Sequence, residues 1–219
     1  MIRLTSEEIL AMNGLLDGKT IEGLAIKASE EPEGERLQKV NKSLTAKEFL
    51  INGKLSDKFM ATAELLKSYK ASNHKIFINN LRIAVIDDTY TVVLDLLPDG
   101  DITISYTPAI VVVKKYIEAL EFLKQGQKER FFEYEKEPRT EEEYEVDLNS
   151  REWENLMVVQ TYLNQRMSVF KTYYFDDKEA FCFDHIKKMK QQRGPKDFRL
   201  DIVKLFDIEA DDEYSHFIN

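Results

Sequence analysis

Cysteine, glycine and proline are scarce in this sequence, and each shortage excludes a class of protein. The 219 residues include one cysteine, Cys182, so no disulfide can form within the chain and the fold does not depend on an oxidising compartment. Eight glycines and five prolines exclude collagen-like and low-complexity sequence. Because 43% of the residues are hydrophobic, the chain can bury a core and is not a generally disordered protein.

Long hydrophobic runs and an excess of basic charge are also missing. The best apolar run, Ala109 to Val113, is far shorter than the ~18 residues of a membrane span, and residues 1–8 lack the pattern of a signal peptide. Lysine and arginine number 31 against 40 acidic residues, a net charge of −9. Such a chain is poorly suited to neutralising the phosphates of nucleic acids, so we expect no nucleic acid partner. Because a membrane span and a signal peptide pattern are also missing, we expect a cytoplasmic location.

Helix caps mark the first part of the chain. Thr5 with Glu8, and Thr45 with Glu48, have the spacing of a capping box, and Ser56 can cap a further helix. The segments predicted from these caps and from hydrophobic periodicity are helices at 5–16, 35–42, 45–52 and 56–69, with a strand at 20–27.

The middle of the chain favours β-structure. Strands are predicted at 74–79, 81–86, 90–97 and 101–106. Asp87-Asp88 and Pro98-Asp99-Gly100 are turn formers, so the strands should form an antiparallel meander. Pro108 suits the first turn of a helix that runs to Lys124.

The second half repeats this order of elements. We predict a strand at 130–135, an exposed acidic segment at 137–147, a helix at 149–165, a hairpin of strands 167–175 and 180–186, a basic loop or helix at 187–193 and a helix at 197–206. The class is therefore α+β, with antiparallel meander sheets flanked by helices in two halves of similar plan. The predicted domains are residues 1–126, residues 127–208 and an acidic tail, 209–219.

No set of residues with the spacing of a catalytic, cofactor or metal site is evident. His74, His185 and His216 are scattered, whereas zinc needs three or four convergent ligands. Residues 14–20 resemble a phosphate-binding loop, but three residues separate the two glycines where four are required. Cys182 alternates with phenylalanines and fits a small buried side chain better than a nucleophile. We expect no cofactor and no metal.

Paired acids supply the alternative enzymatic hypothesis. A hydrolase or transferase could use Asp87, Asp88 and Asp176 if these carboxylates converged in a deep pocket. Their positions in predicted turns favour a structural role.

The basic residues 187–193 lie near aromatic side chains, a combination that can bind single-stranded nucleic acid. We favour instead that this basic stretch pairs with the acidic segment 137–147. Aromatic side chains are dense over 170–183, and one face of that hairpin could serve as a protein interface.

Several segments together resemble a known family. These are the helix over 4–10, the sequence Asn52-Gly53-Lys54-Leu55-Ser56-Asp57-Lys58-Phe59 before the next helix, the meander from 75–78 to 101–104, and the helix that begins at Pro108. The arrangement resembles the EspG-type chaperones of bacterial type VII (ESAT-6-like) secretion and their distant counterparts in Firmicutes. The likeness covers mainly residues 1–125.

The resemblance implies a quasi-twofold α/β fold and a cytosolic adaptor without catalytic residues. Its partner would be a secreted effector or a helical protein of the secretion system, and the sequence leaves a homodimer open. By position, the family's partner-binding elements correspond to a hairpin loop with Asp87, Asp88 and Tyr90 and to a C-terminal helix with Phe198, Val203 and Phe206.

Overall fold

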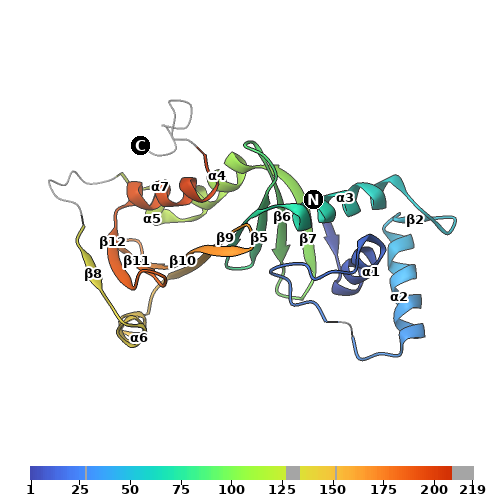
Figure 1. Ribbon diagram of the computed structural model, residues 1–219, viewed down its shortest axis with the longest axis horizontal. Coiled ribbons are helices and arrows are strands. Elements are labelled where there is room, and N and C mark those ends of the chain that lie inside the picture. The colour runs from blue at the N-terminus through green and yellow to red at the C-terminus, as the bar shows by residue number, and fades with distance from the viewer. Residues whose placement is uncertain (28, 127–133, 151, 209–219) are drawn as a thin grey trace. The chain divides into compact units, whose positions relative to one another are not determined.

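The computed structural model describes residues 1–27, 29–126, 134–150 and 152–208. Antiparallel strands flanked by helices make up this part of the chain (Figure 1), which confirms the α+β class. Two compact units are distinguished: unit 1 comprises residues 1–72, 80–86 and 90–107, and unit 2 comprises residues 73–79, 87–89 and those from Pro108 onwards. No helix within the described residues is long and apolar enough to cross a bilayer.

Unit 1 contains three helices and two sets of paired strands. Its elements are β1 (Ile2–Leu4), α1 (Ser6–Leu16), α2 (Glu33–Ala46), β2 (Leu50–Ile51), β3 (Lys54–Leu55), α3 (Asp57–Ala71), β5 (Leu81–Val85), β6 (Tyr90–Leu96) and β7 (Ile102–Pro108). The larger sheet has the strand order β1-β7-β6-β5, and β2 pairs with β3 in a separate hairpin. The Thr5–Glu8 capping box starts α1, and the Ser56 side chain caps α3.

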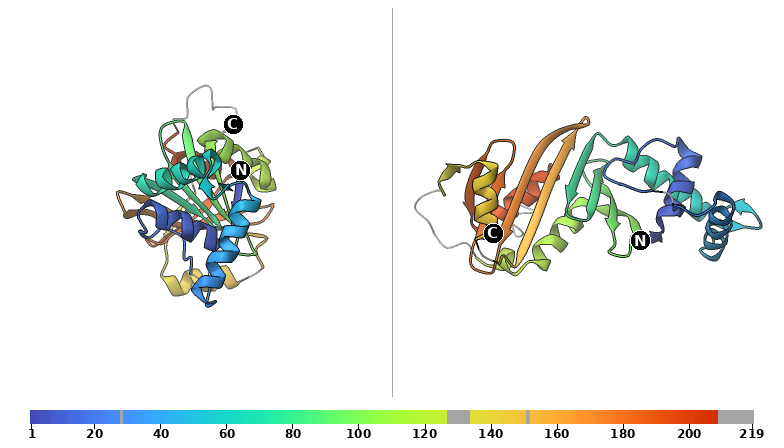
Figure 2. Two further views of the ribbon diagram at one scale, coloured as in Figure 1. Left: turned by 90° about the vertical axis from the view of Figure 1, so that its right-hand side faces the viewer. Right: turned by 90° about the horizontal axis from the view of Figure 1, so that it is seen from below.

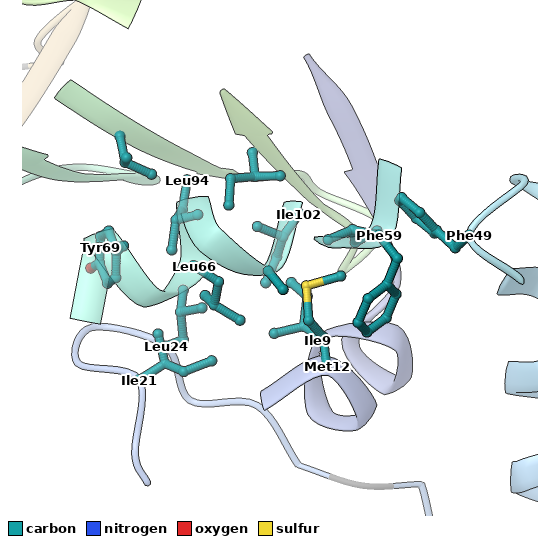
Figure 3. Close-up of a cluster of buried hydrophobic side chains, with 14 of the residues drawn as sticks. Ile9, Met12, Ile21, Leu24, Phe49, Phe59, Leu66, Tyr69, Leu94 and Ile102 are labelled. Atoms are coloured by element: carbon teal, nitrogen blue, oxygen red, sulfur yellow. The ribbon is translucent and has the colours of Figure 1, made fainter. Parts of the chain in front are cut away.

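The core of unit 1 forms where α3 packs against the sheet and α1 packs against α3 (Figure 3). Its buried side chains include Ile9, Met12, Ile21, Leu24, Phe49, Phe59, Leu66, Tyr69, Leu94 and Ile102. Phe49 and Phe59 meet edge to face with ring centroids 6.1 Å apart, which joins the β2–β3 hairpin to α3.

A buried carboxylate ties α1 to α2 in the same unit. The Glu8 side chain is fully buried and accepts hydrogen bonds from Lys47 Nζ at 2.6 Å, Ser43 Oγ at 2.7 Å and the Thr5 amide at 2.7 Å. Burial alone would raise the pKa of this carboxyl, but the three hydrogen bonds and the charge of Lys47 outweigh it and hold the pKa below its ordinary value. Glu8 is therefore ionised at neutral pH.

Unit 2 is built on a longer antiparallel sheet. Its elements are β4 (His74–Ile78), α4 (Ala109–Ala119), α5 (Glu121–Lys124), β8 (Lys136–Pro138), α6 (Glu141–Asn149), β9 (Asn155–Leu163), β10 (Arg166–Phe175), β11 (Ala180–Asp184), β12 (Met189–Arg193) and α7 (Pro195–Leu205). The strand order is β4-β9-β10-β11-β12-β8, and the long β9–β10 hairpin dominates it (yellow to orange in Figure 2).

The two faces of this sheet bury different aromatic groups. Tyr173 and Phe175 on β10 lie against Phe198 of α7, with the Tyr173 and Phe198 rings stacked at 4.4 Å. Tyr174 points to the other face, where it meets Tyr144 of α6 at 6.1 Å and Trp153 at 4.9 Å. Because side chains alternate along a strand, one aromatic run supplies both cores.

Most of the predicted elements are confirmed. The structure contains the helices predicted at 5–16, 56–69 and 197–206, the strands of the 74–106 meander and the hairpin around Asp176. The basic stretch 187–193 does pair with the acidic segment, because β12 pairs with β8, Lys188 binds Glu141 and Lys190 Nζ lies 2.8 Å from Asp147. Cys182 is buried, and burial raises the pKa of its thiol to about 11.

Two predictions in unit 1 were wrong, and one predicted helix is shorter than the helix in the structure. Residues 20–27 form turns rather than a strand, and α2 extends well beyond the predicted 35–42. No helix occupies 45–52, because α2 ends there and the β2–β3 hairpin follows. Asn52 and Gly53 have φ values of 52° and 74°, the conformation of a tight hairpin turn that this dipeptide favours.

Unit 2 holds the larger corrections. The helix predicted at 149–165 is strand β9, and the basic stretch is strand β12 rather than a loop or helix. The acidic segment 137–147 folds as part of β8 and as α6, which its own capping box at Thr140 starts. The helix from Pro108 breaks at Leu120 into α4 and α5. The strand predicted at 130–135 falls mostly outside the described residues, as does the tail 209–219.

Candidate partner-binding surfaces

The turn after β5 presents the first group of predicted partner-binding residues. Asp87 and Asp88 are both exposed, and Asp87 Oδ1 accepts a hydrogen bond from the Thr89 amide at 2.8 Å. The Thr89 carbonyl in turn accepts the Ala109 amide, the first of α4, at 2.8 Å. These two hydrogen bonds fix the turn, and the Asp88 side chain is exposed on it.

Tyr90 follows this turn and belongs to an exposed apolar surface of unit 1. Its ring stacks on that of Tyr106 in β7, with centroids 4.7 Å apart and planes 7° from parallel. Ile86 faces Tyr90 across the turn, where its amide donates to the Tyr90 carbonyl at 3.0 Å. We call Ile86, Tyr90 and Tyr106 the tyrosine patch; these residues are 36%, 37% and 49% exposed. Exposed tyrosines of this kind are common at protein interfaces.

The second predicted group lies on α7 and is buried. Phe198, Val203 and Phe206 are 0%, 1% and 2% exposed, because they hold α7 onto the sheet of unit 2. Their side chains therefore support the helix. A partner that docks on α7 would meet its exposed Lys204 instead.

A groove runs beside the C-terminal end of α7 in unit 2. It has a volume of about 220 Å³. Its lining residues come from β4, β9, β10, α7 and the segment just after α7: His74, Thr161, Leu163, Ser168, Val169, Lys171, Asp201, Lys204, Leu205 and Asp207. Asp201 is held in place by Arg193 at 2.7 Å and by the Tyr173 hydroxyl at 3.0 Å. The groove is therefore a firmly built feature of the α7 face.

The hydroxyl of Thr161 beside this groove leads to a stability prediction. Thr161 Oγ1 is buried, and it makes no hydrogen bond within the described part of the chain. Valine has the same shape without the polar group, so Thr161→Val should raise the free energy of unfolding by about 1 kcal/mol. Chemical denaturation measures this change. Thr161→Ser keeps the hydroxyl and loses the methyl group, so it should be less stable than the parent. A valine variant that is less stable than the parent would mean that the Thr161 hydroxyl does form a hydrogen bond.

Residues 3–192 match the model of a family described as a domain of unknown function, DUF5081. The chain belongs to the DUF5081 family. No curated protein matches it.

Among solved structures, this DUF5081 chain is similar to the type VII secretion system chaperone EspG5 of Mycobacterium tuberculosis, determined in complex with the PE25–PPE41 dimer. The match has a TM-score of 0.58 and covers 95% of this chain and 97% of that chain at 10% sequence identity. At this identity the likeness establishes the fold: the DUF5081 chain has an EspG-like fold along nearly its whole length.

The carboxylates of the enzymatic hypothesis lie on two separate turns of the DUF5081 chain. Asp87 and Asp88 lie on the turn after β5, whereas Asp176 accepts the Lys178 and Glu179 amides in the β10–β11 turn. None of the three lines the groove beside α7. Within the described ranges, no group of three or more His, Cys, Asp or Glu residues is arranged to hold a metal ion.

A hydroxyl, an imidazole and a carboxylate do meet on the α6 side of the sheet. Thr172 Oγ1 lies 2.9 Å from His185 Nε2, and His185 Nδ1 lies 3.3 Å from a Glu141 carboxylate oxygen. The order of groups is that of a hydrolytic triad. However, Thr172 is 2% exposed and Phe170 stacks on the imidazole at 4.0 Å, so no substrate reaches the hydroxyl. Burial lowers the pKa of His185 despite the opposing charge of Glu141, and the trio fastens α6 to the sheet.

Tyr90 is among the residues predicted from the sequence, whereas Tyr106 and the groove are not. Tyr106 joins Tyr90 only through the neighbouring positions of β6 and β7 in the sheet. The sequence signal that could have indicated Tyr106 is an aromatic residue near the end of a predicted strand, just before Pro108.

Proposed function

We propose that this protein is a cytosolic, non-enzymatic chaperone or adaptor for a secreted effector of a type VII secretion system, or for a helical partner of that effector. The observation that carries the proposal is the EspG-like fold over 95% of the chain, shared with a type VII secretion system chaperone whose structure contains the PE25–PPE41 dimer. The chaperone would cover an apolar helical surface of its client and keep the client soluble until export.

The tyrosine patch is the proposed client-binding surface of unit 1. Tyr90 and Tyr106 offer a rigid, exposed aromatic pair, and tyrosine is among the residues that contribute most to binding energy. Asp87 and Asp88, which belong to unit 2, would favour a client that carries basic residues, mainly through the association rate.

In unit 2 the proposed contact is made by α7. Phe198, Val203 and Phe206 take part indirectly, because they fix the helix on the sheet. The exposed side of the helix, including Lys204, would face the client.

Co-expression tests the proposal. The tagged chain is used to isolate partners from the cytosol of its own host, and the candidate client is then produced with and without the chain. A stoichiometric helical effector that becomes soluble only in the presence of the chain supports the proposal. A client from the secretion locus that stays insoluble in both cases contradicts it.

Tyr106 provides a residue-level prediction for the same complex. Tyr106→Ala should weaken client binding about 30-fold, which corresponds to roughly 2 kcal/mol for a central aromatic contact. Because 49% of the side chain is exposed, the fold should be unaffected. Leu37→Ala is the matched control, since Leu37 is 51% exposed in the same unit but lies on α2. Equal affinity of the two variants in a titration would place the client elsewhere.

A further inference from the structure

Two lysines line the groove beside α7, and the part of the chain that the structure describes gives neither of them a carboxylate partner. Lys171 projects from β10 and is half-buried, and Lys204 lies exposed on the last turn of α7. Within the described residues, neither ammonium group forms a hydrogen bond or lies within ion-pair distance of a carboxylate. Two ammonium groups in one small groove repel each other, and an anion bound there would relieve that repulsion.

The carboxylates around the groove are already engaged. Asp201 is bound by Arg193 and Tyr173, and Asp207 lies 3.1 Å from His74 Nδ1. Asp184, which is opposite Lys171 in the β10–β11 pair, accepts two amides of the following turn at 3.1 and 2.9 Å. The acids that could neutralise Lys171 and Lys204 therefore serve other groups.

The size and lining of the groove restrict the anion. About 220 Å³ is less than the roughly 300–1,000 Å³ of sites that hold drug-sized ligands. Leu163, Val169 and Leu205 supply an apolar wall beside the lysines. This combination suits a charged head on a short aliphatic stem better than a nucleotide or a bare inorganic ion.

We propose that the groove binds a carboxylate on a short aliphatic stem, with Lys171 and Lys204 as the groups that hold the charged head. The carboxylate could belong to a free short-chain acid or to a glutamate side chain of a protein docked on α7. The site stands on the geometry of unit 2 alone and does not depend on the proposed chaperone function.

Chemical-shift titration of the ¹⁵N-labelled full chain tests the site, with butyrate as the probe and butyramide as its neutral counterpart. Butyrate should shift amides of β9, β10 and α7 in a saturable manner, and butyramide should not. Lys171→Met and Lys204→Met should each weaken butyrate binding about 10-fold, the value of one charge-assisted hydrogen bond. Lys187→Met, an exposed lysine outside the groove, should change nothing.

Three results would overturn the proposal: no saturable shift with butyrate, equal binding of butyramide, or unchanged affinity in the lysine variants. Thermal melts identify a variant that fails to fold. If Lys171→Met does not fold, the affinity of Lys204→Met tests the proposal, because Lys204 is exposed and its replacement removes no packing. The α-amide of N-acetylglutamate, titrated in parallel, separates the two sources of the carboxylate. Tighter binding of this amide than of butyrate indicates a protein side chain, and the reverse indicates a free acid.

Discussion

Replacement of Phe198 by alanine is expected to lower the free energy of unfolding by about 4 kcal/mol, the usual loss for a large aromatic side chain in a full core. The Phe198 ring is fully buried and stacks on Tyr173 at 4.4 Å, with Phe175 at 5.3 Å and Phe122 at 6.5 Å. Its loss would leave a cavity between α7 and the sheet. Denaturant unfolding followed by fluorescence measures the effect.

Lys204→Ala on the same helix is the control for this prediction, since an exposed lysine should change stability by less than about 0.5 kcal/mol. A loss below about 1 kcal/mol for Phe198→Ala would contradict the packing described for α7. The stability measurement is also needed to interpret binding experiments. If Phe198→Ala unfolds α7, weaker client binding by that variant does not identify Phe198 as a contact residue.

The second large effect is expected at Glu8. Glu8→Ala should cost about 3 kcal/mol, because the Lys47 ammonium loses its carboxylate partner and the Ser43 hydroxyl and the Thr5 amide lose their acceptor. Denaturant unfolding at neutral pH measures the loss. Glu64→Ala removes an exposed ion pair to Lys67 on α3 and should cost no more than about 0.5 kcal/mol.

The pH dependence gives an independent check on Glu8. Its folded-state pKa lies below the ordinary value, so the stabilisation is present above the unfolded-state pKa and is lost as the pH falls through the folded-state pKa. The difference in stability between the parent and Glu8→Ala should therefore shrink in acid. A difference that stays constant down to low pH would mean that the carboxyl is not the group responsible.

Strand β9 shows why part of the fold could not be predicted from the sequence. Leu156, Val159 and Leu163 have helical spacing, but Met157, Val159 and Thr161 alternate with equal regularity. The structure follows the second pattern, and the buried positions of β9 are Met157, Val159 and Thr161. The turn that closes the hairpin contains no glycine or proline: Asn164 and Gln165 adopt φ values of 50° and 63°. Without a turn signal, the local pattern was ambiguous.

The better predictions rest on signals that local chemistry alone provides. The Thr5–Glu8 capping box and the Ser56 cap fix helix starts within one residue, because the side chain that ends the loop also binds the first helical amides. The groove beside α7 has no such local signal. Its walls come from β4, β9, β10 and α7, which only strand pairing brings together.

The pairing of β4 with β9 has a consequence for synthesis of the chain. Residues 73–79 are made early yet belong to unit 2, and their partner strand begins only at Asn155. Ribosomes add roughly 5–20 residues per second, so β4 emerges seconds before β9 exists. Unit 1 is complete once Thr107 has been added and can fold during translation. The nascent protein therefore passes through a stage in which the β9-facing edge of β4 is open to aggregation.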